Sequence, residues 1–257
     1  MGIGYFNVLD DAAKARAAFE RAIAANPDDA RVFYERDQLW KRVGETPAER
    51  LAELERHRHL VDRRDDLSVE LATLYNQTRQ PRKARDVLAG RKFQPWEGGE
   101  GLALAQHERA HLMLGLFEEA LVCPENLGEA RHPLTHPTEI YYRLRRFERA
   151  AEGQGLYRAL ALGQLGRAEE SEAYLQELLE QAREQARKEV GIEYFTTSLP
   201  TMLLFNDDLQ ERNLIDARFL EAQARYGLGE MAEAHRLLDE ILAMDPNHAG
   251  AMDLRNP

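Results

Sequence analysis

Apolar residues recur along this chain at the spacing of a helix face. Near the C-terminus, Ala234, Leu238 and Ile241 are separated by four and three residues, and Pro246 follows five residues later. The same spacing, again ending on a proline, returns over residues 15–27. Residues three and four apart lie on one face of a helix, and proline disfavours helical geometry in the residue before it. The pattern therefore predicts amphipathic helices that end at regular positions.

Short turns divide this pattern into pairs of helices. Besides a single helix over 138–152, we expect pairs over 30–61, 67–90, 102–122, 156–188 and 218–248. The start of one helix is predicted by Thr46, Pro47 and Glu49, because they fit the N-cap, the first helical position and the acidic end of a capping box. No long run rich in Val, Ile and Thr has a period of two, so we expect no sheet.

Three stretches interrupt the pairs, at about 93–101, 124–137 and 190–208, and glycine or proline breaks the helical pattern in each. We interpret them as irregular segments, the first of them as a loop. Asn206 or Asp207 is expected to cap the helix that follows the third irregular segment. The fold class is thus predicted to be all-α, with residues 1–257 forming one array of antiparallel helical pairs. Because Gly2–Phe6 reads like the second half of a helix, we expect the natural protein to be longer.

Charge and composition limit the classes of partner that this chain is expected to bind. The net charge is −11, which disfavours sequence-independent binding to nucleic acid, because such binding neutralises phosphates with clustered Lys and Arg. Cys123, the single cysteine, fits a reducing compartment. No stretch approaches the roughly 20 apolar residues that a membrane span needs. We expect a cytoplasmic protein without nucleic-acid or membrane partners.

A glycine at the turn, then alanine, then leucine or phenylalanine, then a helix-ending proline, at a period of about 34 residues, resembles the tetratricopeptide-repeat family. The resemblance implies an α-solenoid with a concave groove that binds partners. Three further stretches, 96–101, 124–129 and 194–200, are similar to the C-terminal repeat region of large bacterial proteins that begin with a domain of unknown function. That domain resembles sugar-handling β-rich folds, which implies a carbohydrate context.

One motif fits a zinc hydrolase. His107, Glu108 and His111 match the pattern H-E-x-x-H, in which two histidines one helical turn apart share a zinc ion and the glutamate acts as general base. A third ligand would have to come from Glu129, His132 or His136. The motif lies where the first helix of a pair is expected, with no sheet edge to hold a peptide, so we interpret it as structural. We expect no enzyme activity, no metal and no cofactor.

Candidate binding residues lie where the repeat pattern is interrupted. They are Trp96, Glu97, Glu100, Asn126, Glu129, Tyr194 and Phe195. In one interpretation, Trp96 stacks on a sugar or aromatic ligand while Glu97 and Glu100 accept hydrogen bonds. In the other, Trp96 packs between neighbouring repeats and the adjacent glycines let the chain turn.

The groove-facing positions of first helices argue against one binding mode. They carry Asp66, Val69, Glu70, Thr73, Phe219 and Gln223, which lack the Lys, Arg and Asn needed to clamp a peptide carboxylate. A bound peptide is therefore expected to be apolar or basic. The leading hypothesis is a non-catalytic interaction or scaffold module that binds a protein or peptide, with an N-terminal domain of the same polypeptide as one candidate. The alternatives are an accessory region of a larger carbohydrate-active bacterial protein and the zinc hydrolase.

Overall fold

The computed structural model describes residues 1–89, 91–93, 99–122, 137–190 and 204–256. Within these ranges every regular element is a helix and no strand occurs, which confirms the all-α prediction. The helices are α1 (Gly2–Asn7), α2 (Ala12–Ala25), α3 (Ala30–Arg42), α4 (Pro47–Arg56), α5 (Arg58–Val61), α6 (Asp65–Gln77), α7 (Pro81–Ala89), α8 (Gly99–Met113), α9 (Phe117–Ala120), α10 (Thr138–Arg143), α11 (Phe147–Ala151), α12 (Leu156–Gln164), α13 (Ala168–Arg187), α14 (Leu209–Gly227), α15 (Met231–Met244) and α16 (Ala249–Arg255).

In the described part of the chain, a residue with positive φ lies just after the end of the first helix in seven turns between helices that pack on each other. These residues are Asp10, Gly44, Arg79, Gly115, Arg145, Gly166 and Gly229, with φ between 50° and 82°. In six of the turns the next residue donates its N–H to the carbonyl five positions earlier, at 2.7–3.0 Å. This is the Schellman arrangement, which satisfies carbonyls at the end of the first helix.

The spacing of these turns follows the predicted period in the first half of the chain. The intervals between Asp10, Gly44, Arg79 and Gly115 are 34, 35 and 36 residues. The next three intervals, which end at Arg145, Gly166 and Gly229, are 30, 21 and 63 residues. Among the described residues, intervals close to 34 residues therefore occur only in the first half of the chain.

Several predicted boundaries agree with the structure and others are wrong. Thr46 and Glu49 form the expected capping box at the start of α4. The predicted single helix 138–152 is instead α10 and α11, because Arg145 adopts a left-handed conformation between them. The helix α8 already begins at Gly99, inside the predicted loop. The N-cap of α14 is Asp208, not the predicted Asn206 or Asp207.

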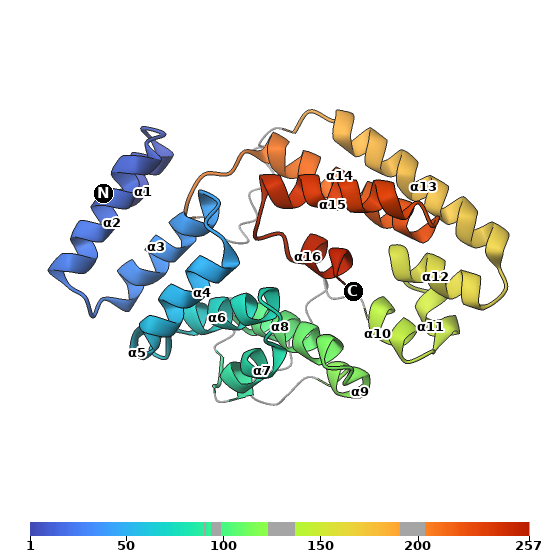
Figure 1. Cartoon of the computed structure of the whole chain (residues 1–257), viewed down its shortest axis with the longest axis horizontal. Coiled ribbons are helices and arrows are strands. Elements are labelled where there is room, and N and C mark those ends of the chain that lie inside the picture. The colour runs from blue at the N-terminus through green and yellow to red at the C-terminus, as the bar shows by residue number, and fades with distance from the viewer. Residues whose placement is uncertain (90, 94–98, 123–136, 191–203, 257) are drawn as a thin grey trace.

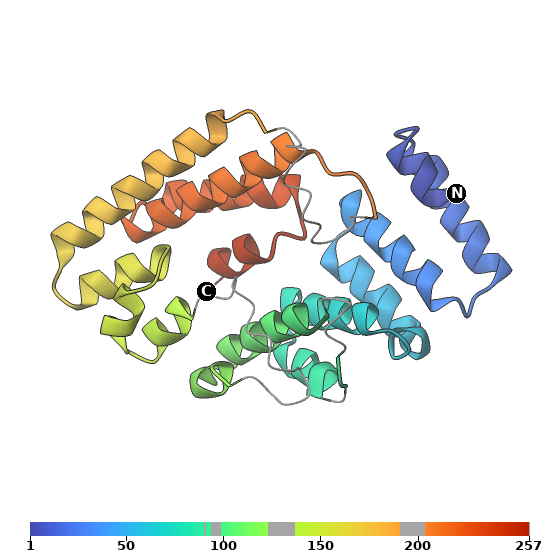
Figure 2. The ribbon, with the colours of Figure 1, turned by 180° about the vertical axis from the view of Figure 1, so that it is seen from behind.

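The helices follow one another around a curve, and α16 lies inside it (Figures 1 and 2). Buried apolar residues of α3–α8 form one cluster, and those of α12 and α14–α16 form another. Phe205 joins the segment before α14 to the N-terminal helices, because it packs with Phe19 and Leu39 in a further cluster. The N-terminal and C-terminal helices therefore meet, and α16 contacts α6. None of the described helices is long and apolar enough to cross a membrane.

Candidate binding site around Arg50

An arginine occupies a position that other pairs give to a small residue. The fourth residue of the second helix is a buried alanine in five pairs, at Ala15, Ala84, Ala120, Ala150 and Ala234. In α13 it is Ser171, and in α4 it is Arg50, whose exposed fraction is 0%. A charged side chain is rarely buried without partners, so its surroundings indicate a specific role.

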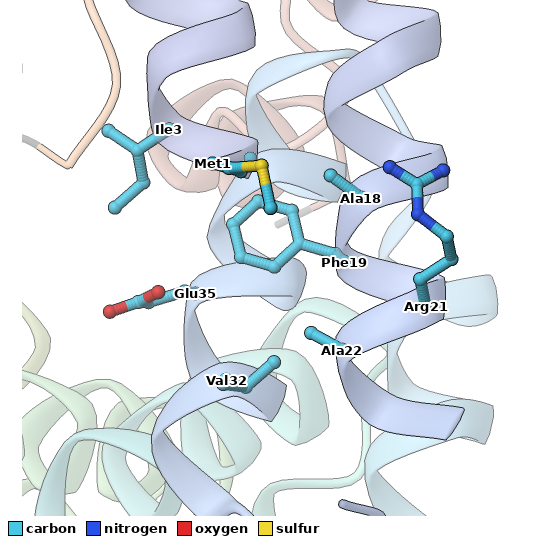
Figure 3. Close-up of a pocket in the computed structure, with 9 residues that line it drawn as sticks. Met1, Ile3, Ala18, Phe19, Arg21, Ala22, Val32 and Glu35 are labelled. Carbon is cyan, nitrogen blue, oxygen red and sulfur yellow. The ribbon is translucent and has the colours of Figure 1, made fainter. Parts of the chain in front are cut away.

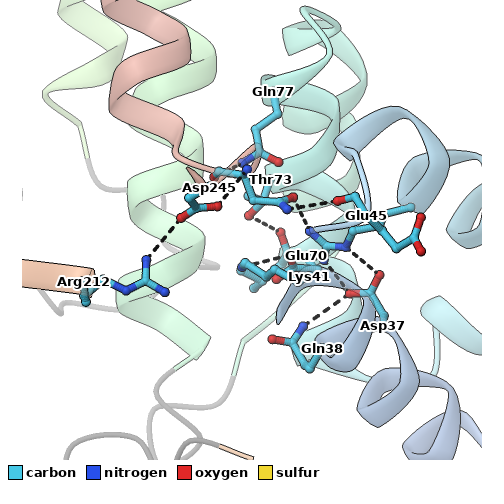
Figure 4. A network of polar contacts seen from close by, with 12 residues as sticks. Asp37, Gln38, Lys41, Glu45, Glu70, Thr73, Gln77, Arg212 and Asp245 are labelled. Atoms are coloured by element: carbon cyan, nitrogen blue, oxygen red, sulfur yellow. Dashed lines mark hydrogen bonds and ion pairs between the residues drawn. The ribbon is translucent and has the colours of Figure 1, made fainter. Parts of the chain in front are cut away.

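Two carboxylates surround the Arg50 guanidinium. Its Nε and Nη2 atoms donate to the two oxygens of Asp37 at 3.1 and 2.6 Å, and Nη2 also donates to Oε1 of Glu70 at 2.6 Å. Lys41 donates to the same Glu70 oxygen at 3.2 Å. The cluster thus unites α3, α4 and α6 (Figure 4), and two cations balance two carboxylates within it.

The two carboxylates respond differently to burial. Burial raises the pKa of Asp37, and Arg50 only partly opposes this effect. Burial acts in the same direction on Glu70, but Lys41 and Arg50 outweigh it and lower the pKa of Glu70 to about 2. The Arg50 guanidinium is itself disfavoured by burial, yet Asp37 and Glu70 raise its pKa. Arg50 is therefore a permanent cation with donors held in a fixed direction.

The remaining Arg50 donor points at a residue from the other end of the chain. Its Nη1 donates to Oδ1 of Asn247 at 2.8 Å, and Nδ2 of Asn247 donates to the Glu45 carbonyl at 3.0 Å. The carbonyl of Asn247 accepts from Nε2 of Gln77 at 2.7 Å. Asn247 is only 7% exposed. The side-chain Oδ1 of Asn247 is thus bound by α4, its Nδ2 by the turn before α4, and its backbone carbonyl by α6.

One predicted groove position, Glu70, contributes to this site through its hydrogen bond with Arg50. Glu70, Thr73 and Gln77 are three and four positions apart on α6, so they share one face of that helix. Glu70 contacts Arg50, and Gln77 contacts Asn247. The predicted preference for an apolar or basic peptide stays a prediction, because the segment held here, Asp245-Pro246-Asn247, belongs to the chain itself. The prediction considered first helices alone, whereas Arg50, on a second helix, supplies the decisive donor.

Further polar contacts flank the Asn247 turn. Arg109 of α8 makes two hydrogen bonds with Asp253 of α16, at 2.7 and 2.9 Å. Arg79 donates to the carbonyls of Met252, at 3.2 Å, and Asn256.

The segment before α14 adds further ion pairs to this contact. Asp207 pairs with Arg42 of α3 and, at 3.0 Å, with Arg212 of α14, which also pairs with Asp245 at 3.2 Å. Hydrogen bonds and ion pairs therefore connect the two apolar clusters described above.

The H-E-x-x-H motif lies on α8, as expected, and both histidines are buried. Their ring centroids are 3.9 Å apart, and Nδ1 of His111 is 2.8 Å from the His107 carbonyl oxygen. Burial lowers the pKa of His107 to about 4 and raises the pKa of Glu108 to about 7. Over the described part of the chain, no three His, Cys, Asp or Glu side chains are grouped so that they could hold a metal ion. The suggested third ligands Glu129, His132 and His136 lie outside it.

The other predicted site residues are not brought together by what the structure describes. Trp96, Glu97, Asn126, Glu129, Tyr194 and Phe195 lie outside the described residues. Glu100 belongs to α8, but only its backbone is described. The convergence of these side chains into one groove therefore stays a prediction.

An apolar cavity of about 370 Å³ lies among α1, α2 and α3 (Figure 3). Its lining includes Ile3, Phe19 and Val32, together with the charged Arg21 and Glu35. Apolar walls orient a ligand weakly, because only placed polar groups fix orientation. The Arg50 cluster is the more specific candidate.

No model of a known protein family matches this chain. Neither Arg50 nor Asn247 was among the predicted site residues. A signal for Arg50 was present, since Arg50, Leu54 and His57 repeat the four-and-three spacing that elsewhere starts with a small residue. Asn247 offered no comparable signal, because its partners lie about 170 to 200 positions away in the sequence.

Proposed function

We propose that this chain is a non-catalytic binding module, a tetratricopeptide-like array of helical pairs that holds a segment of a partner protein on its inner face. The observation that carries the proposal is the turn 245–248 on that face, where Arg50 of α4 and Gln77 of α6 make hydrogen bonds with Asn247. The contacts reach one side-chain amide and one backbone carbonyl, which a segment of another protein can also present.

The repeat geometry supports the same proposal. Seven turns share a left-handed residue, three intervals are close to 34 residues, and a small buried residue recurs at one helix position. Stacked helical pairs of this kind bury a continuous core and leave one extended face for binding. The partner is thus a protein or peptide, with an N-terminal domain of the same polypeptide retained as one candidate.

Position-specific photo-cross-linking tests this function. A benzophenone amino acid at Thr73, between Glu70 and Gln77 on α6, should cross-link a defined protein in extracts of the source organism. The matched control is the same amino acid at Asp86 on α7, whose side chain is 73% exposed. Mass spectrometry should identify a protein linked from Thr73 alone, and the purified partner should bind the unlabelled chain. Equal labelling from both positions, or none from Thr73, would contradict the proposal.

A further inference from the structure

The Asn247 turn has a structural equivalent near the N-terminus. Asn26-Pro27-Asp28 links α2 to α3, as Asp245-Pro246-Asn247 links α15 to α16. In both turns the third residue donates its N–H to the side chain of the first, at 3.4 and 2.9 Å. The Asp28 side chain is 76% exposed, whereas Asn247 is 7% exposed. The turn therefore folds through local bonds, and the contacts of Asn247 with α4 and α6 are additional.

The contacts select an asparagine amide. Arg50 donates to its oxygen, and the Glu45 carbonyl accepts from its nitrogen. An aspartate would lose the second bond and place a carboxylate against that carbonyl oxygen. It would also add a third acid beside Asp37 and Glu70. Since a buried unpaired polar group is costly, the site discriminates between these two nearly isosteric side chains.

Polar contacts hold the Asn247 turn against the first half of the chain. The apolar clusters of α3–α8 and of α12 and α14–α16 share no buried residue. The side chains that join them around the turn are polar, above all Arg50 with Asn247 and Arg109 with Asp253. Polar groups released when the turn separates regain hydrogen bonds with water, which lowers the cost of releasing the turn.

We propose that the site formed by Arg50, Gln77 and the Glu45 carbonyl binds the asparagine of an Asp-Pro-Asn turn in a partner protein, and that the chain's own Asn247 is an intramolecular competitor. This inference rests on the proposed binding function and names its ligand chemistry. An occupant tethered in the same chain acts at a high effective concentration and weakens the apparent affinity of any external ligand. Release of the turn is then the step that switches binding on.

A peptide-binding experiment on the full chain tests this inference. The probe is a fluorescein-labelled peptide with the sequence of residues 243–252, and binding is followed by fluorescence anisotropy. The wild type is compared with the variant Asn247→Ala/Asp253→Ala, which removes bonds from the C-terminal side and leaves Arg50, Gln77 and Arg109 intact. We expect the variant to bind the probe at least tenfold more tightly than the wild type does.

Two control peptides address specificity. One is the probe with aspartate in place of the asparagine, and the other is residues 24–33, which carry Asn-Pro-Asp in the equivalent turn. Both should bind the variant at least tenfold more weakly than the probe does. Adding Gln77→Ala to the variant should weaken probe binding about threefold or more, since it removes the bond to the peptide carbonyl. Equal binding of all three peptides, or no binding of the probe to a folded variant, overturns the inference.

Hydrogen exchange on the wild type provides a second test that needs no variant. Saturating probe should accelerate amide exchange in α16, because displacement of the turn releases the helix from α6 and α8. Unchanged exchange in α16 at probe concentrations up to the millimolar range overturns the inference. If a partner is cross-linked from Thr73 but both peptide tests fail, the proposed binding function is supported and the Asp-Pro-Asn ligand is not.

Discussion

Arg50 shows how one residue can turn a packing position into a polar one. Where other pairs bury a small side chain, Arg50 buries a guanidinium that makes hydrogen bonds with Asp37, Glu70 and Asn247. Replacing a whole buried ionic cluster by apolar groups can be neutral, but removing one partner leaves the others charged and unpaired. The loss of Arg50 alone should therefore be severe.

Arg50→Ala should lower the free energy of unfolding by about 3–5 kcal/mol, since Asp37 loses its bidentate partner and Glu70 keeps only Lys41. Urea unfolding followed by circular dichroism measures this. The control Arg167→Ala breaks an exposed pair with Glu170 and should cost less than about 1 kcal/mol. Adding Asp37→Asn and Glu70→Gln to Arg50→Ala should restore more than half of the loss. A cost below about 1 kcal/mol for Arg50→Ala would show that the cluster is not structurally important.

Glu108 should make the protein less stable as the pH rises. Burial raises its pKa from 4.5 to about 7, so between these values the folded chain keeps a proton that the unfolded chain has released. Stability is then lost as the pH rises through this window. Glu108→Gln should be more stable than the wild type by about 1 kcal/mol at pH 8, after allowance for solvent screening of a partly exposed group, and the gain should vanish near pH 4.5. Urea titrations at both pH values test this, with Glu172→Gln, at an exposed position of α13, as the matched control.

Among the elements, the left-handed turns set where each helix pair reverses. Gly229 has φ +78° with no atom within 4 Å of a Cβ placed there, so a substitution is opposed by the backbone alone. Gly163 lies inside α12, also with open space around it, but without a positive φ. The two glycines thus differ in backbone conformation and not in available room.

Gly229→Ala should therefore lower the free energy of unfolding by about 1 kcal/mol, because left-handed geometry is costly for an L-residue. Gly163→Ala should raise it by up to about 0.5 kcal/mol, because alanine is favoured over glycine at helical positions and Gly163 lies in the last turn of α12. Thermal unfolding of both variants beside the wild type gives the comparison. Changes of the same sign would contradict this account of the turns.

The short helix α16 depends on a histidine cap. His248 begins this helix, and its Nδ1 accepts from the N–H of Ala251 at 3.0 Å, which requires an unprotonated Nδ1. Burial lowers the pKa of His248, although Asp245 and Asp216 partly oppose this. The unfolded chain therefore takes up the proton first as the pH falls below 6.5, so stability is lost on acidification and retained above that value.

His248→Asn should keep a cap that does not titrate. Between pH 7.5 and 5.5 the melting temperature of the wild type should fall more than that of the variant. The contribution of His107, whose pKa is also lowered, is common to both proteins and cancels in the difference. Parallel pH profiles for the two proteins would contradict this role of His248.

At the scale of the whole molecule, apolar packing at Phe205 and several polar contacts close the curve of the described helices. Phe205 packs edge-on against Phe6 and Phe19, with ring centroids 5.3 and 6.2 Å away. Asn7 adds hydrogen bonds to Leu204 and Asn206. The Arg50 contact with Asn247 lies between the same two halves of the chain. Phe205 therefore attaches the halves by apolar packing, and under the proposal above the contact of Arg50 with Asn247 determines whether the inner face is covered.

Phe205→Ala should lower the free energy of unfolding by about 3–5 kcal/mol, as expected for a buried phenylalanine. It should also raise amide exchange in α1 and α2 and increase the radius of gyration measured by X-ray scattering. Leu102→Ala, at a residue that is 55% exposed, is the control and should change stability by no more than about 0.5 kcal/mol. An unchanged radius of gyration and unchanged exchange in α1 would show that Phe205 does not join the halves.

The all-α fold, the capping box at Thr46 and most helix boundaries followed from the sequence, because apolar spacing and turn residues act over a few positions. The split between α10 and α11 could not be predicted, because Arg145 has the left-handed backbone of a turn position that glycine usually occupies. The predicted binding residues gave no candidate site within the described chain. The Arg50 site was found only through contacts between residues far apart in the sequence.

The sequence by itself determined that this chain is helical and where most helices lie, because those properties depend on neighbours within one or two turns. It did not predict the break between α10 and α11 or the last helix, α16. Only the tertiary structure decided which segment covers the inner face. Arg50 and Asn247 are separated by 197 positions, and the path between them includes pairs whose spacing departs from the 34-residue period. Small changes of direction at each pair add up along such a chain, so the meeting of these two residues is a property of the whole fold.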